Sequence, residues 1–188
     1  MSLFALQRAP RTIEFGSGQR ASLAMHARAL GQKALIVTDE RMGGSAALGE
    51  LVDALKTAGV AVAVFDSTLP EVPLDCIDQC VAFGQSFGPD LVIGLGGGSC
   101  LDMAKATAVL LAHGGSPRDY FGEFKVPGPV LPLIAVPTTA GTGSEATPVA
   151  VVADSERLLK VGIASPHIIP LVAICDPELT LSAPAGLT

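Results

Sequence analysis

Short apolar runs rich in β-branched residues alternate with segments of helical periodicity along most of the chain. Residues 34–38 (ALIVT) and 91–93 (LVI) are runs of the first kind, and residues 45–58 carry apolar side chains every three or four positions. Continuous apolar strands are typical of sheets covered on both faces. Strands that alternate with helices of about 10–15 residues predict right-handed βαβ units. We therefore expect an α/β fold with a doubly wound, mainly parallel sheet and a ligand crevice at the carboxyl ends of its strands.

The same patterns predict the remaining elements. Strands are expected at residues 12–15, 34–38, 60–65, 91–93, 131–136 and 171–175, and helices at residues 19–30, 45–58, 73–86 and 99–112. Residues 149–153 and 158–163 predict a hairpin, and the stretch 113–129, with its glycines and prolines, predicts a loop. Because no linker or repeat divides the chain, residues 1–188 are expected to form one domain.

Composition excludes several classes of protein. Of the 188 residues, 49% are hydrophobic and 16% charged, which is too apolar for a disordered chain. The net charge is −6 and the lysines and arginines are scattered, so nothing indicates binding to nucleic acid or to an anionic membrane. No apolar run reaches the roughly 18 residues of a membrane span, and the start lacks a secretory pattern. A cytoplasmic protein whose partner is a small molecule or another protein is expected.

The cysteines and histidines do not predict a metal site. The four cysteines form no Cys-x-x-Cys pair, and the three histidines are far apart and lack His-x-x-x-His spacing. Free, buried thiols are the simpler expectation for the cysteines. Asp176, in an Asp-Pro pair at the end of a predicted strand, has no partners for a hard-ligand site, so we do not expect it to bind metal.

A run of glycines joins the strand 91–93 to the helix 99–112. With no side chains at Gly96, Gly97 and Gly98, a phosphate can approach the main-chain N–H groups, and the helix dipole favours an anion there. Ser99 is expected to cap the helix or to bind a phosphate oxygen. The literal Gly-x-Gly-x-x-Gly spacing and the lysine of a P-loop are both missing, so a tight strand-to-helix turn is the alternative.

Two aspartates are expected near the ligand crevice at the carboxyl ends of the strands. Asp102 is expected in the first turn of the helix, where the dipole stabilises a carboxylate with or without a ligand. Beside a phosphate it would be repulsive, so a functional role would direct it to a ribose, a nicotinamide or the substrate. Asp39 ends a strand, where an acidic residue of a dinucleotide fold binds the adenosine ribose and favours NAD over NADP. An ordinary capping aspartate is the alternative.

A second polar loop, residues 137–147, follows the strand 131–136. It places five hydroxyl side chains and two glycines in eleven residues, a pattern that favours contact with phosphate or adenine. No Gly-x-Ser-x-Gly segment occurs, so a serine hydrolase is not supported. Lys160 lies inside an apolar strand and either projects into the crevice or faces solvent from an edge strand.

Three segments together resemble the iron-containing (group III) alcohol dehydrogenases. They are Gly96–Lys105, Pro137–Glu145 and Asp176–Thr180, in the order that the family has them. The resemblance implies a Rossmann-like, dehydroquinate synthase-like nucleotide-binding domain. It also implies an all-helical metal-binding domain, which would follow residue 188.

The resemblance also implies roles for individual residues. Asp39 would bind the adenosine ribose, Gly97, Gly98 and Ser99 the pyrophosphate, and Asp102 the nicotinamide side. The remaining cofactor-binding residues that it implies are Thr138, Thr139, Thr142, Thr147, Lys160 and Leu179. No catalytic residue and no metal ligand within this chain is implied.

The function implied for the full-length protein is that of an NAD-dependent, metal-dependent alcohol dehydrogenase. A small alcohol or aldehyde would be its substrate, Fe²⁺ or Zn²⁺ its metal, and a homo-oligomer its assembly. These 188 residues alone are expected to bind NAD(H) without turnover. The alternatives are another enzyme of the same fold, such as a maleylacetate reductase, a glycerol dehydrogenase or a dehydroquinate synthase-like enzyme, and a non-catalytic nucleotide-binding module.

Overall fold

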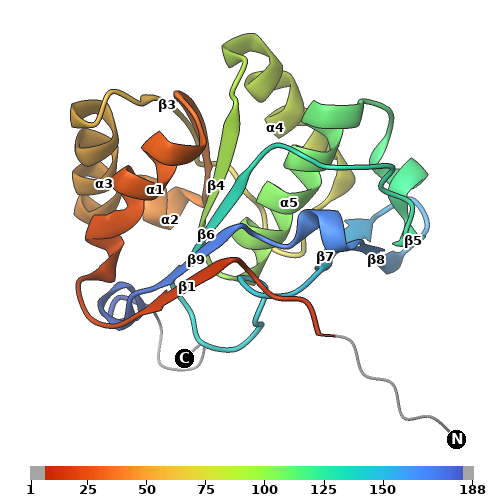
Figure 1. Cartoon of the computed structure of the whole chain (residues 1–188). Helices are drawn as coiled ribbons and strands as arrows, with labels where there is room; N and C mark the ends of the chain where they lie inside the picture. The colour runs from red at the N-terminus through yellow and green to blue at the C-terminus, as the bar shows by residue number, and fades with distance from the viewer. Residues whose placement is uncertain (1–6, 184–188) are drawn as a thin grey trace, which may run out of the picture.

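The computed structural model describes residues 7–183 and contains a six-stranded sheet in which every pair of neighbours is parallel (Figure 1). The strand order is β1-β9-β6-β4-β2-β3. These strands are β1 (Thr12–Phe15), β2 (Lys33–Val37), β3 (Ala61–Phe65), β4 (Leu91–Gly96), β6 (Leu133–Pro137) and β9 (Val172–Cys175). The predicted α/β class and parallel sheet are confirmed.

Helices cover both faces of this sheet, as a doubly wound fold requires. One face packs against α1 (Leu23–Leu30), α2 (Glu40–Gly43) and α3 (Ala46–Thr57). The other packs against α4 (Leu74–Phe87) and α5 (Gly98–His113). Short 3₁₀ helices complete the chain: η1 (Gln19–Ser22), η2 (Pro117–Tyr120), η3 (Pro166–Ile168) and η4 (Pro177–Thr180).

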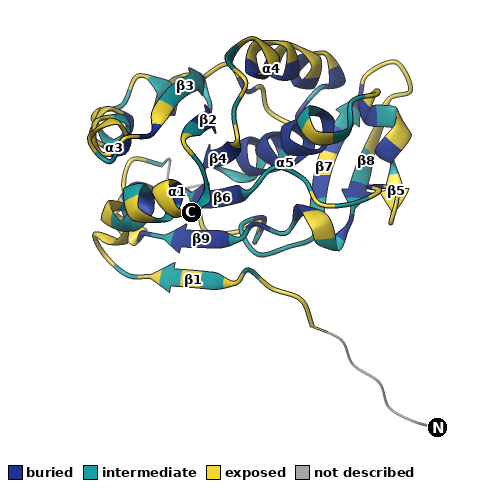
Figure 2. Cartoon of the chain, turned by 45° about the horizontal axis from the view of Figure 1, so that its top comes forward, coloured by how far each residue is buried: buried dark blue, intermediate teal, exposed yellow. Residues whose placement is uncertain are grey.

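Strand β2 shows how an apolar run produces two cores. Successive side chains of a strand point to opposite faces. Leu35 and Val37 therefore enter the cluster with α4 and α5, whereas Ala34 and Ile36 enter the cluster with α1 and α3. All four are buried, and the central strands and α5 are the most buried part of the molecule (Figure 2). Burial on both faces explains why the strand is apolar throughout rather than alternating.

A second, three-stranded sheet lies beside α5, with the order β5-β8-β7. Its strands are β5 (Gly122–Glu123), β7 (Val149–Asp154) and β8 (Leu159–Ala164). The antiparallel pair β7 and β8 is the predicted hairpin. Their buried residues join the cluster of α4 and α5, so the two sheets share one apolar core.

The structure differs from the sequence prediction at several boundaries. The stretch 113–129 is not only loop, because Ser116 and Asp119 form a capping box at the start of η2, and β5 follows. Residues 19–30 begin as a 3₁₀ helix and become α-helical only at Leu23. The short helix α2 was not predicted. The strand predicted from residue 131 begins at Leu133, after a proline that cannot donate to the ladder.

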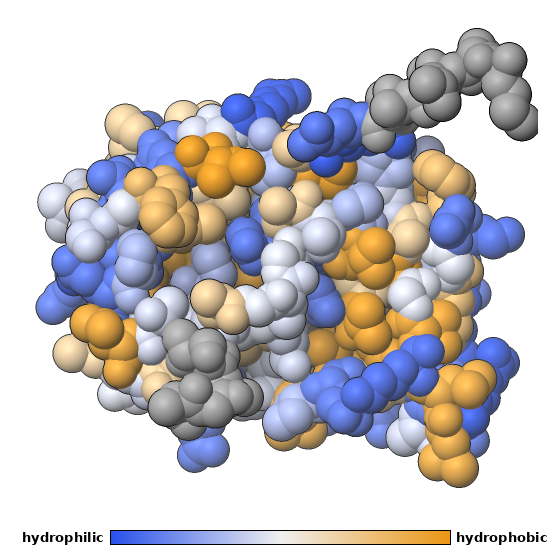
Figure 3. Space-filling view, turned by 90° about the horizontal axis from the view of Figure 1, so that it is seen from below, coloured by the Kyte–Doolittle hydropathy of each residue, from blue (hydrophilic) through white to orange (hydrophobic). Residues whose placement is uncertain are grey.

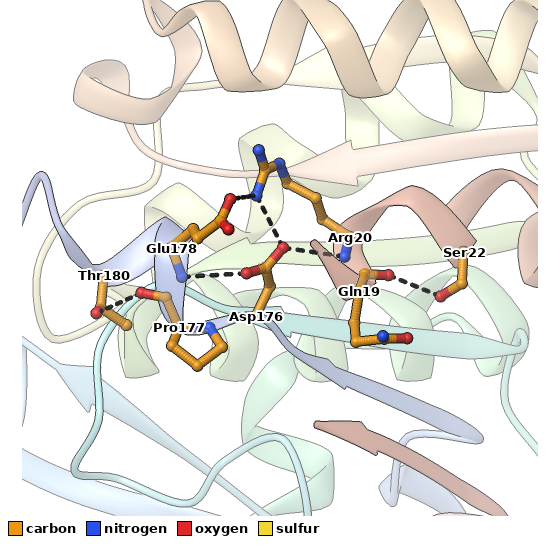
Figure 4. Close-up of polar contacts among 7 residues, drawn as sticks. All are labelled: Gln19, Arg20, Ser22, Asp176, Pro177, Glu178 and Thr180. Atoms are coloured by element: carbon orange, nitrogen blue, oxygen red, sulfur yellow. Dashed lines mark hydrogen bonds and ion pairs between the residues drawn. The ribbon is translucent and has the colours of Figure 1, made fainter. Parts of the chain in front are cut away.

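A partly buried ion pair joins η1 to η4 across the ends of β1 and β9 (Figure 4). Asp176 accepts hydrogen bonds from the backbone N–H and the guanidinium of Arg20, at 3.1 and 2.9 Å, and from the N–H of Glu178 at 3.0 Å. Burial opposes ionisation of this carboxyl, yet these donors lower its pKa below the ordinary value. Both oxygens of Asp176 therefore accept hydrogen bonds from within the chain.

Candidate nucleotide-binding site

A cavity of about 950 Å³ lies at the carboxyl ends of β2, β3, β4 and β6. The connection after β2 runs to the face with α2 and α3, whereas the connection after β4 runs to the face with α5. Open α/β sheets bind ligands where neighbouring connections diverge in this way. The view from below shows this side of the molecule, with apolar and polar surface exposed together (Figure 3).

Nine of the eleven predicted cofactor-binding residues line this cavity. They are Asp39, Gly97, Gly98, Ser99, Asp102, Thr139, Thr142, Thr147 and Lys160. Three separate segments of the sequence supply eight of them, and Lys160 comes from β8. The fold therefore collects at one place residues that are more than 100 positions apart.

The glycine turn, residues 96–98, joins β4 to α5 and leaves the start of this helix open toward the cavity. Gly97 is the N-cap and provides no side-chain hydrogen bond to the helix. The first N–H groups of a helix have no intrahelical partner, and together with the helix dipole they favour an anion. Because the cavity is lined by Gly97, Gly98 and Ser99, this helix start borders the cavity.

Ser99 does not cap the helix, and that part of the prediction is wrong. Its hydroxyl accepts a hydrogen bond from the backbone N–H of Glu71 at 3.3 Å. The helix starts one residue earlier than predicted, at Gly98, so Ser99 already lies within the first turn. The hydroxyl instead links the first turn of α5 to the loop that follows β3.

Asp39 caps a helix, which was the alternative that the sequence left open, and it also lines the cavity. Its Oδ1 accepts a hydrogen bond from the N–H of Met42 at 2.8 Å and caps α2. Its Oδ2 lies 3.8 Å from the Sγ of Cys100, and the residue lines the cavity. The thiol of Cys100 is buried, which raises its pKa to about 12, so it faces Asp39 as a neutral group.

Asp102 lies in the second turn of α5, not in the first as predicted, because the helix begins at Gly98. Its Oδ1 accepts a hydrogen bond from the hydroxyl of Ser144 at 2.6 Å, and its Oδ2 accepts one from the N–H of Val151 at 3.0 Å. Burial raises the pKa of the carboxyl, while these two donors and the charge of Lys105 act in the opposite direction. The carboxylate thus anchors the second polar loop and borders the cavity.

The second polar loop brings three of its four predicted threonines to the cavity. Thr142 packs so closely on the glycine turn that a Cβ at Gly98 would lie 2.5 Å from its Cγ2. Thr138 does not line the cavity. It is fully buried, its N–H donates to the carbonyl of Gly96 at 2.9 Å, and its hydroxyl has no hydrogen-bond partner among the described residues. Its place is beneath the pocket, where it joins β6 to β4.

The last two predicted residues lie in different surroundings. Lys160 donates to the carboxylate of Glu71 at 2.7 Å, and both side chains are more than half exposed at the cavity rim. Leu179 is 5% exposed and packs in the apolar cluster with α1 and α3, away from the cavity lining.

The sequence interpretation missed four polar residues of the lining: Arg41, Thr68, Glu71 and Ser144. Ser144 lies in the predicted polar loop but was not singled out. Arg41 and Thr68 follow the ends of β2 and β3, so the rule that strand ends meet at one edge could have found them. The hydroxyl of Thr68 is buried and lacks a hydrogen-bond partner in the part of the chain that the structure describes.

Residues 7–183 do not supply a metal centre, since no group of three or more His, Cys, Asp or Glu side chains within them is placed to hold an ion. The metal that the family resemblance implies therefore finds no fitting donor set in the described chain. None of the helices in this same range is long and apolar enough to cross a membrane.

The fold and the cavity define a Rossmann-like α/β domain with its pocket at the carboxyl edge of a parallel sheet. A model of the family described as iron-containing alcohol dehydrogenase matches residues 10–177. The chain belongs to the iron-containing alcohol dehydrogenase family.

Similar proteins with assigned activities are oxidoreductases. The chain is 41% identical over 157 residues to the NAD-dependent methanol dehydrogenase of Bacillus methanolicus, and 40% identical over 158 residues to the sulfoacetaldehyde reductase of Bilophila wadsworthia. Each match covers 84% of this chain and 41% of the relative. The chain thus spans less than half the length of these relatives.

Solved structures agree with this placement. The crystal structure of a 1,3-propanediol oxidoreductase matches 99% of this chain with a TM-score of 0.95 at 32% identity. The sulfoacetaldehyde reductase of Bifidobacterium kashiwanohense, solved in complex with NAD⁺, matches 99% with a TM-score of 0.88 at 33% identity. The matched part is 49% and 50% of those chains, respectively.

Proposed function

We propose that the cavity binds NAD(H), with its pyrophosphate at the start of α5. The observation that carries this proposal is the uncapped helix start bordered by Gly97 and Gly98 within a cavity of about 950 Å³. A cavity of this size matches the upper range of small-molecule and cofactor sites. The relative solved with NAD⁺ supports the same ligand.

The lining residues divide the cavity into regions of different chemistry. Asp39 would accept hydrogen bonds from the adenosine ribose, and its charge would repel a 2′-phosphate. Thr139, Thr142 and Thr147 offer hydroxyl groups that donate or accept along the cofactor. Asp102, which anchors the second polar loop, would face the nicotinamide end rather than the phosphates, since like charges repel.

For the whole protein we propose metal-dependent hydride transfer between a small alcohol or aldehyde and nicotinamide. Membership of the iron-containing family and the activities of the relatives support it. A bound metal would act as a Lewis acid on the substrate oxygen. The described residues contribute the cofactor site, so we expect residues 1–188 alone to bind NAD(H) without turnover. A homo-oligomer and a cytoplasmic location remain predictions, as does the choice between Fe²⁺ and Zn²⁺.

Titration of the purified chain with NADH, ADP-ribose and NADPH tests the cofactor proposal. NADH and ADP-ribose are expected to bind, and NADPH about tenfold or more weakly, because one like-charge contact is commonly worth a tenfold factor in affinity. Failure of both NADH and ADP-ribose to bind would favour the alternative of a structural module. Equal affinity for NADPH would contradict the role given to Asp39, with Arg41 as the residue then positioned to accept the 2′-phosphate.

Asp39→Asn separates the ribose contact from the capping role. Asparagine caps helices about as well as aspartate, so α2 should stay folded. NADH binding is expected to weaken about threefold to tenfold and the preference over NADPH to narrow, since a charged hydrogen bond is stronger than a neutral one. Asp53→Asn, an exposed position on α3, is the matched control and should leave both affinities unchanged.

A further inference from the structure

Lys105 carries a buried ammonium that the proposed function does not use. It lies in α5 with 1% of its surface exposed. Its Nζ donates to the carbonyl oxygens of Val149 and Thr147 at 2.8 and 2.9 Å, and to the hydroxyl of Thr147 at 3.3 Å. An ammonium has three N–H donors, and these acceptors use all three.

Asp102 reaches the same segment from one turn earlier on α5. Residues three apart share a helix face, so Asp102 and Lys105 project side by side. The carboxylate holds the hydroxyl of Ser144 and the N–H of Val151, at the two ends of the stretch that Lys105 holds in its middle. Two side chains of one rigid helix thus fix residues 144–151 along their length.

This segment is a wall of the cavity, whereas Lys105 is behind it. Ser144, Thr147, Val149 and Val151 line the cavity, and Lys105 does not. We propose that Lys105 is a positioning residue for dinucleotide binding: its ammonium holds the backbone of residues 147–149 against α5 and so sets the distance between this wall and the glycine turn. The inference rests on the nucleotide-binding function proposed above.

The ammonium can lose its proton within an accessible pH range. Burial lowers the pKa of Lys105 to about 8, against the opposing effect of the negative charges of Asp102 on the same helix and Glu145 on the loop. Among the described residues, these two are the ionisable groups whose charges act on it. A neutral amine has two N–H donors, so one of the three acceptors would lose its partner and the wall would loosen as the pH rises through about 8.

The contribution of Lys105 to the free energy of unfolding changes with pH in the opposite direction from its expected effect on nucleotide binding. The two effects can therefore be distinguished. The folded pKa lies below the ordinary lysine value of 10.5, so the unfolded chain holds the proton to higher pH. The contribution of Lys105 to the free energy of unfolding therefore increases between pH 8 and pH 10.5. Weaker nucleotide binding in this pH range would therefore not be caused by a loss of folding stability through Lys105.

NADH titrations near pH 6.5 and pH 9.5 test the proposal on four proteins: the wild type, Lys105→Met, Lys105→Arg and Lys56→Met. Lys56 is exposed on α3 and is the matched control. In the wild type, affinity is expected to fall several-fold at the higher pH, because the two values lie on either side of the pKa of Lys105. Lys105→Met should bind about tenfold more weakly at the lower pH and lack the pH step, as expected for a residue that acts through its neighbours.

Arginine keeps its charge across this range, so Lys105→Arg should lose the pH step while retaining more affinity than the methionine variant. Lys56→Met should behave as the wild type. Wild-type affinity in Lys105→Met, or an undiminished pH step in Lys105→Met or Lys105→Arg, would overturn the proposal. If Lys105→Met does not fold, the wild-type profile and Lys105→Arg decide.

Hydrogen exchange without nucleotide distinguishes failure of this inference from failure of the cofactor proposal. Lys105→Met is expected to reduce protection of the amides in residues 144–151, including the N–H of Val151 that Asp102 accepts, with the central strands unchanged. Unchanged protection of these amides in Lys105→Met would show that Lys105 does not hold residues 144–151 in place. Lys105→Met could instead lose this protection while the wild type fails to bind NADH. That result would refute the cofactor site and, with it, the role of Lys105 in positioning NADH.

Discussion

Gly96 is the residue at which the backbone geometry of the site leaves least choice of side chain. Its φ is +145°, in the region that favours glycine, and a Cβ there would lie 2.6 Å from the Sγ of Cys100. Its carbonyl also accepts the N–H of Thr138, which ties the ends of β4 and β6 together. The missing side chain at Gly96 therefore permits the turn into α5 beside Cys100.

Gly96→Ala is expected to reduce the free energy of unfolding by about 1–3 kcal/mol, through backbone strain and overlap with Cys100. Gly49→Ala makes the same change in the middle of α3, where nothing lies within 4 Å of the new Cβ. That variant should be more stable than the wild type by about 0.5–1 kcal/mol. Urea unfolding of both proteins measures the contrast, and equal effects at the two sites would contradict the strain at Gly96.

At the scale of elements, an ion pair with η2 holds the hairpin β7–β8 at the end where the hairpin turns. The guanidinium of Arg118 donates to both oxygens of Asp154, at 2.8 and 2.9 Å, and the side chain of Asp154 is fully covered. The hydrogen bonds from Arg118 lower the pKa of Asp154 to about 2, from its ordinary value of 3.8. The same hairpin carries Lys160, so this contact helps to place the cavity rim.

Asp154→Asn is expected to destabilise the protein at neutral pH, because the guanidinium of Arg118 loses its covered carboxylate partner and keeps only the exposed carboxylate of Glu156. A carboxyl with a depressed pKa stabilises the fold above its ordinary pKa and loses that contribution as the pH falls toward the folded value. The difference between wild type and variant should therefore shrink from pH 3.8 to about pH 2. Unfolding curves at several pH values measure it.

Glu156→Gln provides the control for this element. Glu156 pairs with the same Arg118, but its side chain is 76% exposed. Exposed ion pairs contribute little, so this variant should resemble the wild type at neutral pH. A pH-independent difference between Asp154→Asn and the wild type would show that the carboxylate charge is not what matters.

At the scale of the whole molecule, the two sheets are expected to unfold together. Buried residues of β7 and β8 lie in the same apolar cluster as α4, α5 and the main sheet. Tyr120 is the only tyrosine and there is no tryptophan, and this buried residue lies in η2 beside the second sheet. Its fluorescence therefore reports on that region, while far-UV circular dichroism is dominated by the helices of the main fold.

Denaturation followed by these two signals is expected to give coincident transitions, because a shared core couples the parts into one cooperative unit. Coincidence would also support the prediction that residues 1–188 form one domain. An earlier loss of the tyrosine signal would show that the second sheet is an independent unit, and it would contradict that prediction.

The large pattern of the fold could be predicted from the sequence, and the exceptions have local causes. The strands β2, β4 and β6 were predictable because burial on both faces demands apolar side chains throughout. Helix α2 was missed because its four residues are too short for periodicity, and only the cap at Asp39 marks it. The start of α5 was placed one residue late, and for that reason Ser99 and Asp102 were assigned to the wrong turn positions.

The site was predictable as two loops and an aspartate, but not as a set of contacts. The glycine run and the hydroxyl-rich loop are visible in the sequence because each has an unusual composition. The pairing of Glu71 with Lys160, and the burial of Leu179 in the core, depend on segments that are distant in sequence.

The sequence alone determined the α/β class, the parallel sheet and two of the loops that line the cavity, since periodicity and glycine content are local properties of a chain. Only the tertiary structure decided what each polar side chain does there. Lys105 could have been a surface lysine of α5 by its sequence, and it became a buried clamp because the second polar loop folds back across that helix. Side-chain roles of this kind depend on which segments meet in space, and a local pattern does not contain that information.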